Sequence, residues 1–560
     1  DVNPERGTGA ARRASSCRNI VFELVEAQVD STIPAPRVTA RDPESELHAK
    51  EIEDMLSNEL DRIPFEYIND ADERTTVIQG GDFFLVEWDS TKRTHTAVGE
   101  LSVRLIHPKQ LIPQKGKLSI EDSDYIFILL TQSKGAIKKK YGVSVESEVE
   151  SNPEIRGGDD AADELVTQII AYYRSNSGTI GRVSWVNDTL LESRDDYFGR
   201  SVYKCSQCGA RCTGIVCACG GKCELSHENY DILSQEIVLR DERGKAYRRI
   251  PRGAKIPRYA PRRFPIVLRK NVSIYSELLG NSDVDFIRDQ QNNIKKLLTK
   301  IDDKIYKAGS YLTLPVGVNI PMTDEELKVI KINDPAQKSM IDMFNIQPDI
   351  GKDLTMISTY YESAKETLGI TDSFLGRRDP TATSGRAKEF AAGQSAGRLE
   401  SKRVMKRAAY AELFCVMFQF MLAYTDEPRS YVAKDRVGNR IYKVFNRYDF
   451  LERDEAGEWY WNDEYLFGTD SAAALASNRE AMWQETRMNF QQGAFGAPND
   501  VQALHIFWNL MNELHYPGAA HVLAQLDLAQ QEAAPQEGMP QEMPPMDAPQ
   551  MGAPQMPGMM

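Results

Sequence analysis

Two stretches in the middle of the chain each carry apolar residues along one narrow helical stripe. Apolar positions that recur every three or four residues predict helices that pack side by side along a seam. We expect one helix from Ser282 to about Ala308 and a second from about Asp349 to Leu368. The seam residues are Ile287, Ile294, Leu298, Ile301 and Ile305 in the first helix, and Leu354, Ile357, Tyr361 and Leu368 in the second.

About forty residues, 309–348, connect these two helices, and they read "GSYLTLPVGVNIPMTDEELKVIKINDPAQKSMIDMFNIQP". The segment contains short β-prone pieces and internal prolines, and it is long for the turn of an ordinary helical hairpin. It therefore predicts a small β-containing head held at the end of two rods. The alternative is a helical hairpin buried within a globular core.

Six of the eight cysteines fall in the window "KCSQCGARCTGIVCACGGKC", residues 204–223. Two short turns bear the pairs Cys205/Cys208 and Cys217/Cys219, and glycines follow both pairs, as in a zinc ribbon. Four thiolates would close the shell of a structural Zn²⁺ ion, with Cys212 and Cys223 as substitute ligands. Disulfides are the alternative, but the sequence carries no sign of export to an oxidising compartment. We expect a metal-binding module at 200–228, inserted in a β-containing domain.

The net charge of −14 argues against a protein that grips DNA over a broad surface. One run, 240–270, is nevertheless rich in Arg and Lys. It forms either a solvated or inter-subunit face or a nucleic-acid contact. No stretch is long and apolar enough to span a membrane, and no signal-peptide pattern is present, so we expect a protein without a membrane anchor.

The rest of the chain predicts an α+β protein. Residues 1–41 read as an irregular arm, and Asp42 and Pro43 begin a helix that ends before Pro64. Alternating apolar runs predict strands within 75–133, 164–188, 237–250 and 263–270. Turn-forming residues fill 371–384, and a long helix follows to about Tyr424, with a kink expected near Gly393 and Gly397. Two helical segments lie within 471–516, and 531–560 has the composition of a disordered tail.

Enzymatic function finds no support in the motifs. The sequence contains no phosphate-binding loop, no H-E-x-x-H pair, no dinucleotide fingerprint and no nucleophile elbow. We therefore expect a protein that is not an enzyme and that acts as a mechanical or scaffolding component.

Several phrases and their order resemble the portal proteins of tailed bacteriophages. They are "NSGTIGRVSWVND" (176–188), "RFPIVLRKNVSIYSELLGNSDVDFIRDQQNNIKKLLTKI" (263–301), "VIKINDPAQ" (329–337), "ATSGRAK" (382–388) and "SNREAMWQETRMNF" (477–490). The resemblance covers about 43–520 and implies the family's wing, stem, clip and crown. By position, 1–42 is an arm, 43–280 and 385–470 are the wing, 281–308 and 349–370 are the stem helices, 309–348 is the clip, 371–384 is the tunnel loop and 471–530 is the crown.

The resemblance implies a ring of about twelve subunits at one capsid vertex, closed by one repeated interface, with double-stranded DNA passing through its axis. Implied partners are the terminase large subunit, a head-completion or adaptor protein at the clip, the major capsid protein and a scaffold. The protein would assemble in the bacterial cytoplasm and reside in the virion. The residues implied at the channel are Arg377, Arg378, Thr383, Ser384 and Lys388.

Two alternatives remain open at this point. The arginines of the loop would either touch DNA phosphates weakly or form salt bridges between subunits. The whole chain could instead be a zinc-ribbon DNA-binding or DNA-processing enzyme, with the ribbon and the basic run 240–270 gripping its substrate. The cysteine module is not a general feature of portal proteins, so the resemblance assigns it no role.

Overall fold

The computed structural model describes the chain from Cys17 to Leu526, with gaps. The predicted disordered tail, most of the predicted tunnel loop and parts of the predicted clip lie outside the described residues. The residues not described are 1–16, 44, 96, 146–164, 177, 213–216, 218, 229, 241–244, 316–327, 333–342, 371, 373–384, 435–439, 470–478, 498–499, 515, 517, 520, 524 and 527–560.

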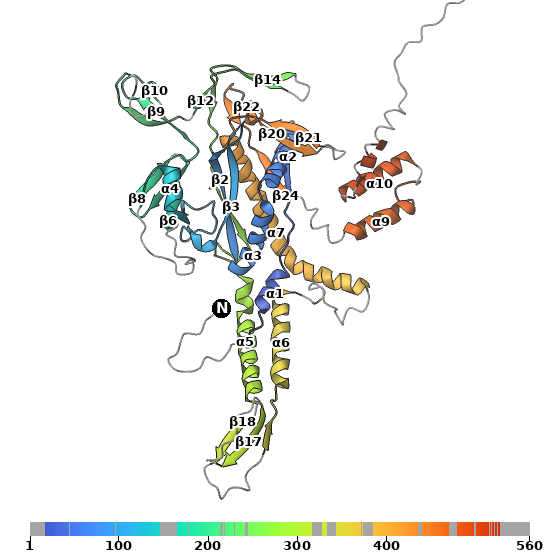
Figure 1. The fold of residues 1–560 in the computed structure, drawn as a ribbon. Helices are drawn as coiled ribbons and strands as arrows, with labels where there is room; N and C mark the ends of the chain where they lie inside the picture. The colour runs from blue at the N-terminus through green and yellow to red at the C-terminus, as the bar shows by residue number, and fades with distance from the viewer. Residues whose placement is uncertain are drawn as a thin grey trace, which may run out of the picture. The chain divides into compact units, whose positions relative to one another are not determined.

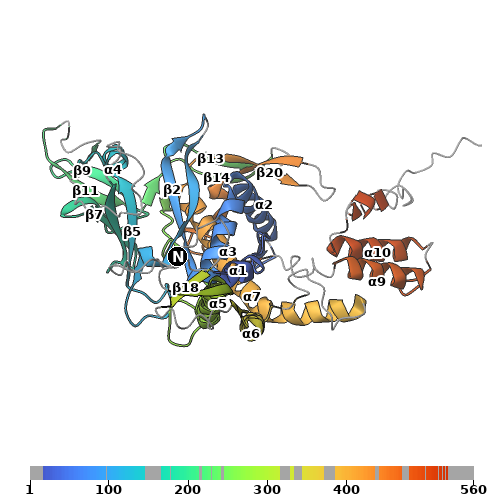
Figure 2. The same ribbon diagram turned by 60° about the horizontal axis from the view of Figure 1, so that its bottom comes forward.

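The chain divides into two compact units. One contains Asp1–Ala433 and Tyr442–Asp470, and the other contains Lys434–Ile441 and Ser471–Met560. The larger unit mixes helices with several antiparallel sheets (Figures 1 and 2). The predicted α+β class is therefore confirmed.

The main core of the larger unit forms around the long helix α7 (Gly385–Tyr424). Its second half buries large side chains such as Phe414 and Phe418 against strands of two surrounding sheets. In Figure 1 the golden first part of α7 runs in a different direction from the part inside the core, in agreement with the predicted kink. The strands around it are β2 (Gly81–Arg93), β3 (Val98–Ile106) and β16 (Ile266–Lys270) in one sheet, and β1 (Pro36–Ala40) with β24 (Tyr465–Thr469) in another.

A five-stranded antiparallel sheet packs beside this core, in the order β4-β5-β6-β7-β8. The turn near Asn176 joins β6 to β7, as the sequence predicts. The short helix α4 (Lys134–Tyr141) covers one end of the sheet. The strands are β4 (Leu111–Pro113), which follows the 3₁₀ turn η1 (Pro108–Gln110), β5 (Tyr125–Ser133), β6 (Leu165–Arg174), β7 (Ile180–Val186) and β8 (Thr189–Arg194).

Smaller sheets follow the five-stranded sheet in the chain. The cysteine window lies in a three-stranded sheet of order β10-β9-β11, built from β9 (Arg200–Cys205), β10 (Arg211–Cys212) and β11 (Cys223–Glu228). The two-stranded pairs are β12 (Tyr230–Ile232) with β15 (Lys255–Pro257), β13 (Ile237–Arg240) with β14 (Ala246–Ile250), β20 (Arg429–Lys434) with β21 (Arg440–Phe445), and β22 (Leu451–Arg453), which follows η4 (Arg447–Phe450), with β23 (Trp459–Trp461).

The N-terminal region differs from the prediction in two respects. Residues 17–41 are not an irregular arm, because they contain helix α1 (Ile20–Glu26) and strand β1. The next helix, α2 (Glu46–Arg62), begins later than predicted. Asp42 lies outside it, and its carboxylate accepts a hydrogen bond from the backbone N–H of Ser45, the residue at the N-cap. A further helix that the sequence did not predict, α3 (Phe65–Gln79), follows directly.

Two helices leave the body of the larger unit as a hairpin. They are α5 (Asp283–Lys307) and α6 (Gly351–Leu368), at the positions that the sequence predicts. Between them lie β17 (Gly309–Pro315), β18 (Lys328–Ile332) and β19 (Met343–Ile346), which form a three-stranded sheet of order β18-β17-β19. Figure 1 shows this sheet at the far end of the two rods, where a small β-containing head was expected.

The second unit contains two described helices, α9 (Arg479–Gln491) and α10 (Val501–Glu513). An aromatic core joins them, in which the rings of Phe490 and Phe507 stack with centroids 4.4 Å apart. The indole N–H of Trp483 donates to the carbonyl of Leu514 and completes this small helical unit.

Candidate metal centre and stem

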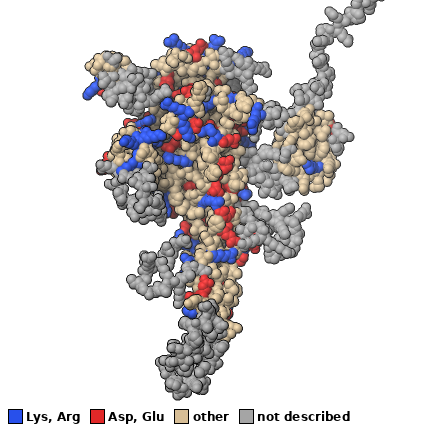
Figure 3. All heavy atoms as spheres, viewed as in Figure 1, with Lys and Arg blue, Asp and Glu red and all other residues tan. Residues whose placement is uncertain are grey.

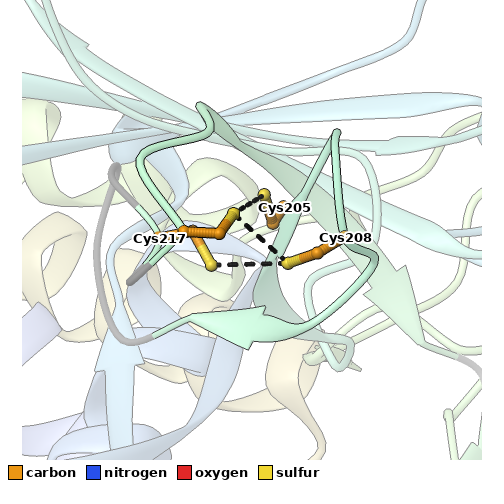
Figure 4. A group of neighbouring side chains, drawn as sticks. Cys205, Cys208 and Cys217 are labelled. Carbon is orange, nitrogen blue, oxygen red and sulfur yellow. Dashed lines mark hydrogen bonds between the residues drawn. The ribbon is translucent and has the colours of Figure 1, made fainter.

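Four thiols of the cysteine window converge on one point in the small three-stranded sheet (Figure 4). The sulfurs of Cys205, Cys208, Cys217 and Cys219 all lie within 4.8 Å of one another, and three of the pairs are 3.4 to 3.5 Å apart. A disulfide needs sulfurs about 2 Å apart. Four sulfurs about 2.3 Å from a tetrahedral ion are about 3.8 Å from each other. The spacing therefore fits a shared metal ion, and these are the four ligands that the sequence analysis preferred.

Glycines close the two turns that carry the sulfurs. The N–H of Gly209 donates to the carbonyl of Cys205, and the N–H of Gly220 donates to the carbonyl of Cys217, each at 2.9 Å. Both glycines have positive φ, of 69° and 83°, which a side chain disfavours. At Gly221 an added Cβ would lie only 2.6 Å from the sulfur of Cys205. The glycines that follow each cysteine pair are thus required by the turn and by the sulfur.

The electrostatics of the cluster favour a bound cation. The backbone N–H groups of Cys208 and Gln207 point at the Cys205 thiol and lower its pKa to about 6. The N–H of Ala210 favours the thiolate of Cys208 as well, but the crowded sulfurs of Cys219, Cys217 and Cys205 raise the pKa of Cys208 to about 12. The Cys205 thiolate therefore forms readily, whereas hydrogen bonds with the neighbouring sulfurs hold the proton on Cys208; a bound cation would favour the thiolate there.

Of the two substitute ligands, only Cys223 has a described side chain, and it is not part of this group. Cys223 is buried on β11, and its sulfur is not within the set of four. Cys212 lies on β10, and its side chain is outside the described residues. The described side chains therefore supply four thiols and no carboxylate or imidazole at this site.

The hairpin buries most of its predicted seam. Among the predicted residues, Ile287, Ile294 and Ile301 of α5 are buried with Ile357, Tyr361 and Leu368 of α6, and Leu298 packs partly against them. Two predicted seam residues, Ile305 and Leu354, do not join this core and are 52% and 48% exposed in the single chain. Both lie at the end of the hairpin that carries the small sheet, where an ion pair occupies the space between the helices.

That ion pair centres on Asp353 of α6. Its carboxylate accepts hydrogen bonds from Lys300 at 3.0 Å and from Lys304 at 2.5 Å, and both lysines belong to α5. Lys304 also donates to the carbonyl of Asp349 at 2.7 Å. The hydrogen bonds from Lys304 and Lys300 lower the pKa of Asp353. A polar strap therefore fixes the two rods to each other next to the sheet.

Helix α1 ties the other end of the hairpin to the body. Its residues Ile20 and Leu24 are fully buried in the seam core. The side-chain oxygen of Gln291 on α5 accepts from the backbone N–H of Ile20 at 2.9 Å. Tyr361 of α6 donates to Glu23 at 2.7 Å, and Glu26 pairs with Arg74 of α3. One short helix thus contacts both rods and the body.

A cluster of buried charges, which we call the junction cluster, lies where α7, α3 and the sheet meet above the hairpin. It consists of Asp72 and Glu73 on α3, Asp82 on β2, Arg269 on β16 and Lys406 on α7, all at most 5% exposed. Arg269 pairs with Asp72, and it reaches Glu73 at 2.6 Å. Lys406 reaches Glu73 at 3.0 Å. Ion pairs therefore join α3, β16 and α7 in the interior, and Asp82 of β2 accepts a hydrogen bond from Thr76 of α3 at 3.2 Å.

The junction cluster contains more carboxylates than cations, and their pKa values reflect it. Burial and the adjacent Asp72 raise the pKa of Asp82 well above its ordinary value. Burial also raises the pKa of Asp72, although Arg269 opposes the shift. Next to the cluster, Lys402 of α7 pairs with Asp283 at the start of α5. Ion pairs thus connect the long helix to the base of the hairpin.

The sequence does not predict the junction cluster, because helix α3, which carries Asp72 and Glu73, has no regular apolar pattern. The inward face of that helix carries Asn69, Asp72, Glu73 and Thr76, so its apolar periodicity is weak. The available signal was the pair Pro64 and Gly80, residue types that mark the start and the end of a helix.

The basic run 240–270 is only partly a surface feature. Arg269 belongs to the junction cluster, Arg258 pairs with Asp231 at 3.0 Å, and Arg248 donates to the carbonyl of Leu451. On the face shown in Figure 3, acidic and basic side chains are interspersed. These contacts favour a structural role for the inward arginines and leave fewer cations for a nucleic-acid contact.

The structure does not describe the side chains of the predicted channel residues. Arg377, Arg378, Thr383 and Ser384 lie outside the described residues, and Lys388 lies on α7 with its side chain outside the description. Their role in a tunnel loop stays a prediction. Among the described helices, none combines the length and the apolar character that a membrane-spanning segment needs.

Comparison with known proteins adds no relative. No protein-family model matches the sequence, and no curated protein is significantly similar to it.

Proposed function

We propose that the chain is a portal subunit of a tailed bacteriophage. About twelve copies would form a closed ring by one repeated head-to-tail contact. Double-stranded DNA would pass along the axis during packaging and ejection. The small sheet of β17–β19 would be the clip that docks the terminase large subunit and later an adaptor protein, and the outer body would contact capsid and scaffold proteins in the virion.

The observation that carries this proposal is the hairpin of α5 and α6 with a small sheet at its end. Two helices that leave the body can bury only the faces that they turn to each other. The remaining surface keeps apolar side chains exposed, among them Ile305 and Leu354, together with Phe286 and Met356. Such side chains on a protruding rod are typical of a surface that other subunits cover.

The experiment compares assembly of two single variants of the full chain by light scattering. We expect the wild type to form particles near 757 kDa, which is twelve copies of the 63.1 kDa chain. Leu354→Glu places a charge on the exposed rod and should shift the protein toward monomers. Leu47→Glu is the control, since Leu47 is an exposed leucine on α2. Equal assembly of both variants would argue against packing between rods, and a wild type that is monomeric under all conditions would reject the proposal.

We further propose that the cysteine cluster holds a structural Zn²⁺ ion. Four thiols close a tetrahedral shell, whereas catalytic zinc keeps a position open for water or substrate. Metal analysis should find one zinc ion per chain, lost in Cys205→Ser and retained in Cys415→Ser, whose thiol lies away from the cluster. Equal zinc content in the two variants would contradict this assignment.

The alternative of a zinc-ribbon DNA-processing enzyme has less support. The four-thiol set leaves no open ligand position, and several arginines of the basic run face inward. DNA affinity or nuclease activity that disappears in Cys205→Ser would favour this alternative over the portal.

A further inference from the structure

One face of the five-stranded sheet β4–β8 packs against the main core, and the other face points away from it. The register pairs Ile128 with Ile170, and Ile126 with Tyr172. These side chains point to the main core and are buried with Ile180 of β7. Because strand residues alternate between faces, the odd-numbered residues of β5, β6 and β7 point to the opposite face.

That opposite face, which we call the outer sheet face, is mostly apolar, with Thr and Ser as its polar residues. Among the described residues of the five strands, those that point to it include no charged side chain. Its ring contacts run from Tyr125 to Phe127 at 5.4 Å and from Phe127 to Trp185 at 6.2 Å. Its hydrophobic side chains include Ile112, Tyr125, Phe127, Leu129, Ile169, Val183, Trp185 and Leu190.

The outer sheet face is also only partly covered, since its central side chains, such as Phe127 and Trp185, are half-buried. Ile112, Tyr125 and Leu190 are 50%, 40% and 58% exposed. None of these eight hydrophobic side chains belongs to a hydrophobic core formed by the described residues. Helix α4 packs on the other side of the sheet, through Ile137 against Val166 and Val186. A sheet with one face in the core ordinarily turns polar residues to water on the other.

The chain's own neighbouring segment is a poor cover for this face. Residues 146–164 connect α4 to β6 and contain eight acidic residues and one basic residue. Placing such a segment over a charge-free apolar surface would remove many carboxylates from water without giving them partners. The composition of the face therefore favours contact with an apolar surface.

The size and composition of the face match part of a permanent interface between subunits. Five strands about 4.8 Å apart and seven residues about 3.4 Å apart cover roughly 400 Å². One side of a stable interface buries about 800 Å², so this face would supply roughly half of it. Interface cores between identical subunits are depleted in charge and enriched in aromatic residues, as this face is.

We propose that a neighbouring copy of the chain covers the outer sheet face in the assembled ring. This inference rests on the proposed portal function and adds a second contact, far along the chain from the rods. The body would then hold its neighbour through this face, while the hairpins pack around the axis.

The test uses the full chain with the double substitution Ile112→Glu and Leu190→Glu. Both side chains are exposed, so the variant should fold and keep the thermal midpoint of the wild type. Two carboxylates placed in an apolar contact should lower the association constant of the contact about a hundredfold, taking about tenfold for each, and so raise the concentration needed for assembly. The control carries Leu47→Glu and Tyr275→Glu, which alter exposed side chains on α2 and before α5, and it should assemble as the wild type does.

The outcomes separate this inference from the proposed function. A double variant that assembles like a ring-forming wild type overturns the inference and leaves the portal proposal standing. A wild type that never assembles overturns both. Oxidative footprinting of wild-type rings gives an independent readout: protection of Tyr125 and Trp185 on assembly supports the inference, and unchanged labelling overturns it.

Discussion

Arg269 offers the sharpest test of how the interior holds the long helix, α3 and the sheet together. Arg269→Met preserves much of the side chain's length and removes the cation that pairs with Asp72 and Glu73. Asp72 would then lose its ion pair, and Glu73 would keep only its pair with Lys406. Breaking a buried ion pair by removing one partner costs about 3–5 kcal/mol, because the other charge stays buried. We expect the free energy of unfolding to fall by about this amount at pH 7.5.

The pH dependence follows from the carboxyl groups. Burial raises the pKa of Asp82 and Asp72 in the folded state, so these groups take up protons on folding and oppose it as pH rises through their folded pKa. Arg269 holds the pKa of Asp72 down, and its loss raises that pKa further. The loss of unfolding free energy in the variant, relative to the wild type, should therefore become smaller as pH is lowered from 7.5 to 5. The change is up to about 1.4 kcal/mol per pH unit for each proton.

The assay is guanidinium unfolding of dilute protein, followed by tryptophan fluorescence at both pH values. The matched control is Arg288→Met, which removes the same charge from a side chain that is 66% exposed and pairs with Asp285. An exposed ion pair contributes less than about 1 kcal/mol. Equal deficits in the two variants, or a deficit that does not change with pH, would refute the role given to the junction cluster.

Three further predictions concern the hairpin and the metal centre. Ile294→Ala should lower the stability of the hairpin by about 2–5 kcal/mol, because Ile294 is fully buried. Hydrogen exchange of the backbone amides of α5 measures this loss of stability. The control Ile305→Ala should lower the stability of the isolated chain far less. Asp353→Asn should loosen the rods next to the small sheet. Since the folded pKa of Asp353 is lowered, the wild type should lose this stabilisation as pH falls through that pKa, and exchange of α6 in the variant should not follow that change. Gly221→Ala should speed metal loss to a chelator, since its Cβ would crowd the Cys205 sulfur, and an unchanged rate would count against the cluster geometry.

The sequence predicted the elements whose periodicity is regular and whose environment is apolar. Helices α5 and α6 have strict apolar spacing, and the cysteine pairs have both ligand spacing and glycines, so both were located to within a few residues. Helix α3 was not predicted, because its buried face is ionic rather than apolar. Its partners Arg269 and Lys406 are about 200 and 330 residues away along the chain. No local pattern can reveal such a pairing.

The ends of elements depended on contacts that the local sequence does not specify. Ile305 continues the apolar stripe of α5, yet Lys300, Lys304 and Asp353 occupy the space that its partner would need. Helix α1 is only seven residues long, and it is held by Gln291 and Tyr361 of the hairpin rather than by its own propensity. Both cases are tertiary effects that override a local pattern.

Electron microscopy of the purified full-length chain tests the central proposal most directly. If the chain is a portal subunit, class averages viewed along the axis will show closed rings with a central opening, and side views will show the hairpins gathered into a stalk below a wider body. Solitary particles without an opening, or rings in which the hairpins lie at the outer rim, would contradict the proposal.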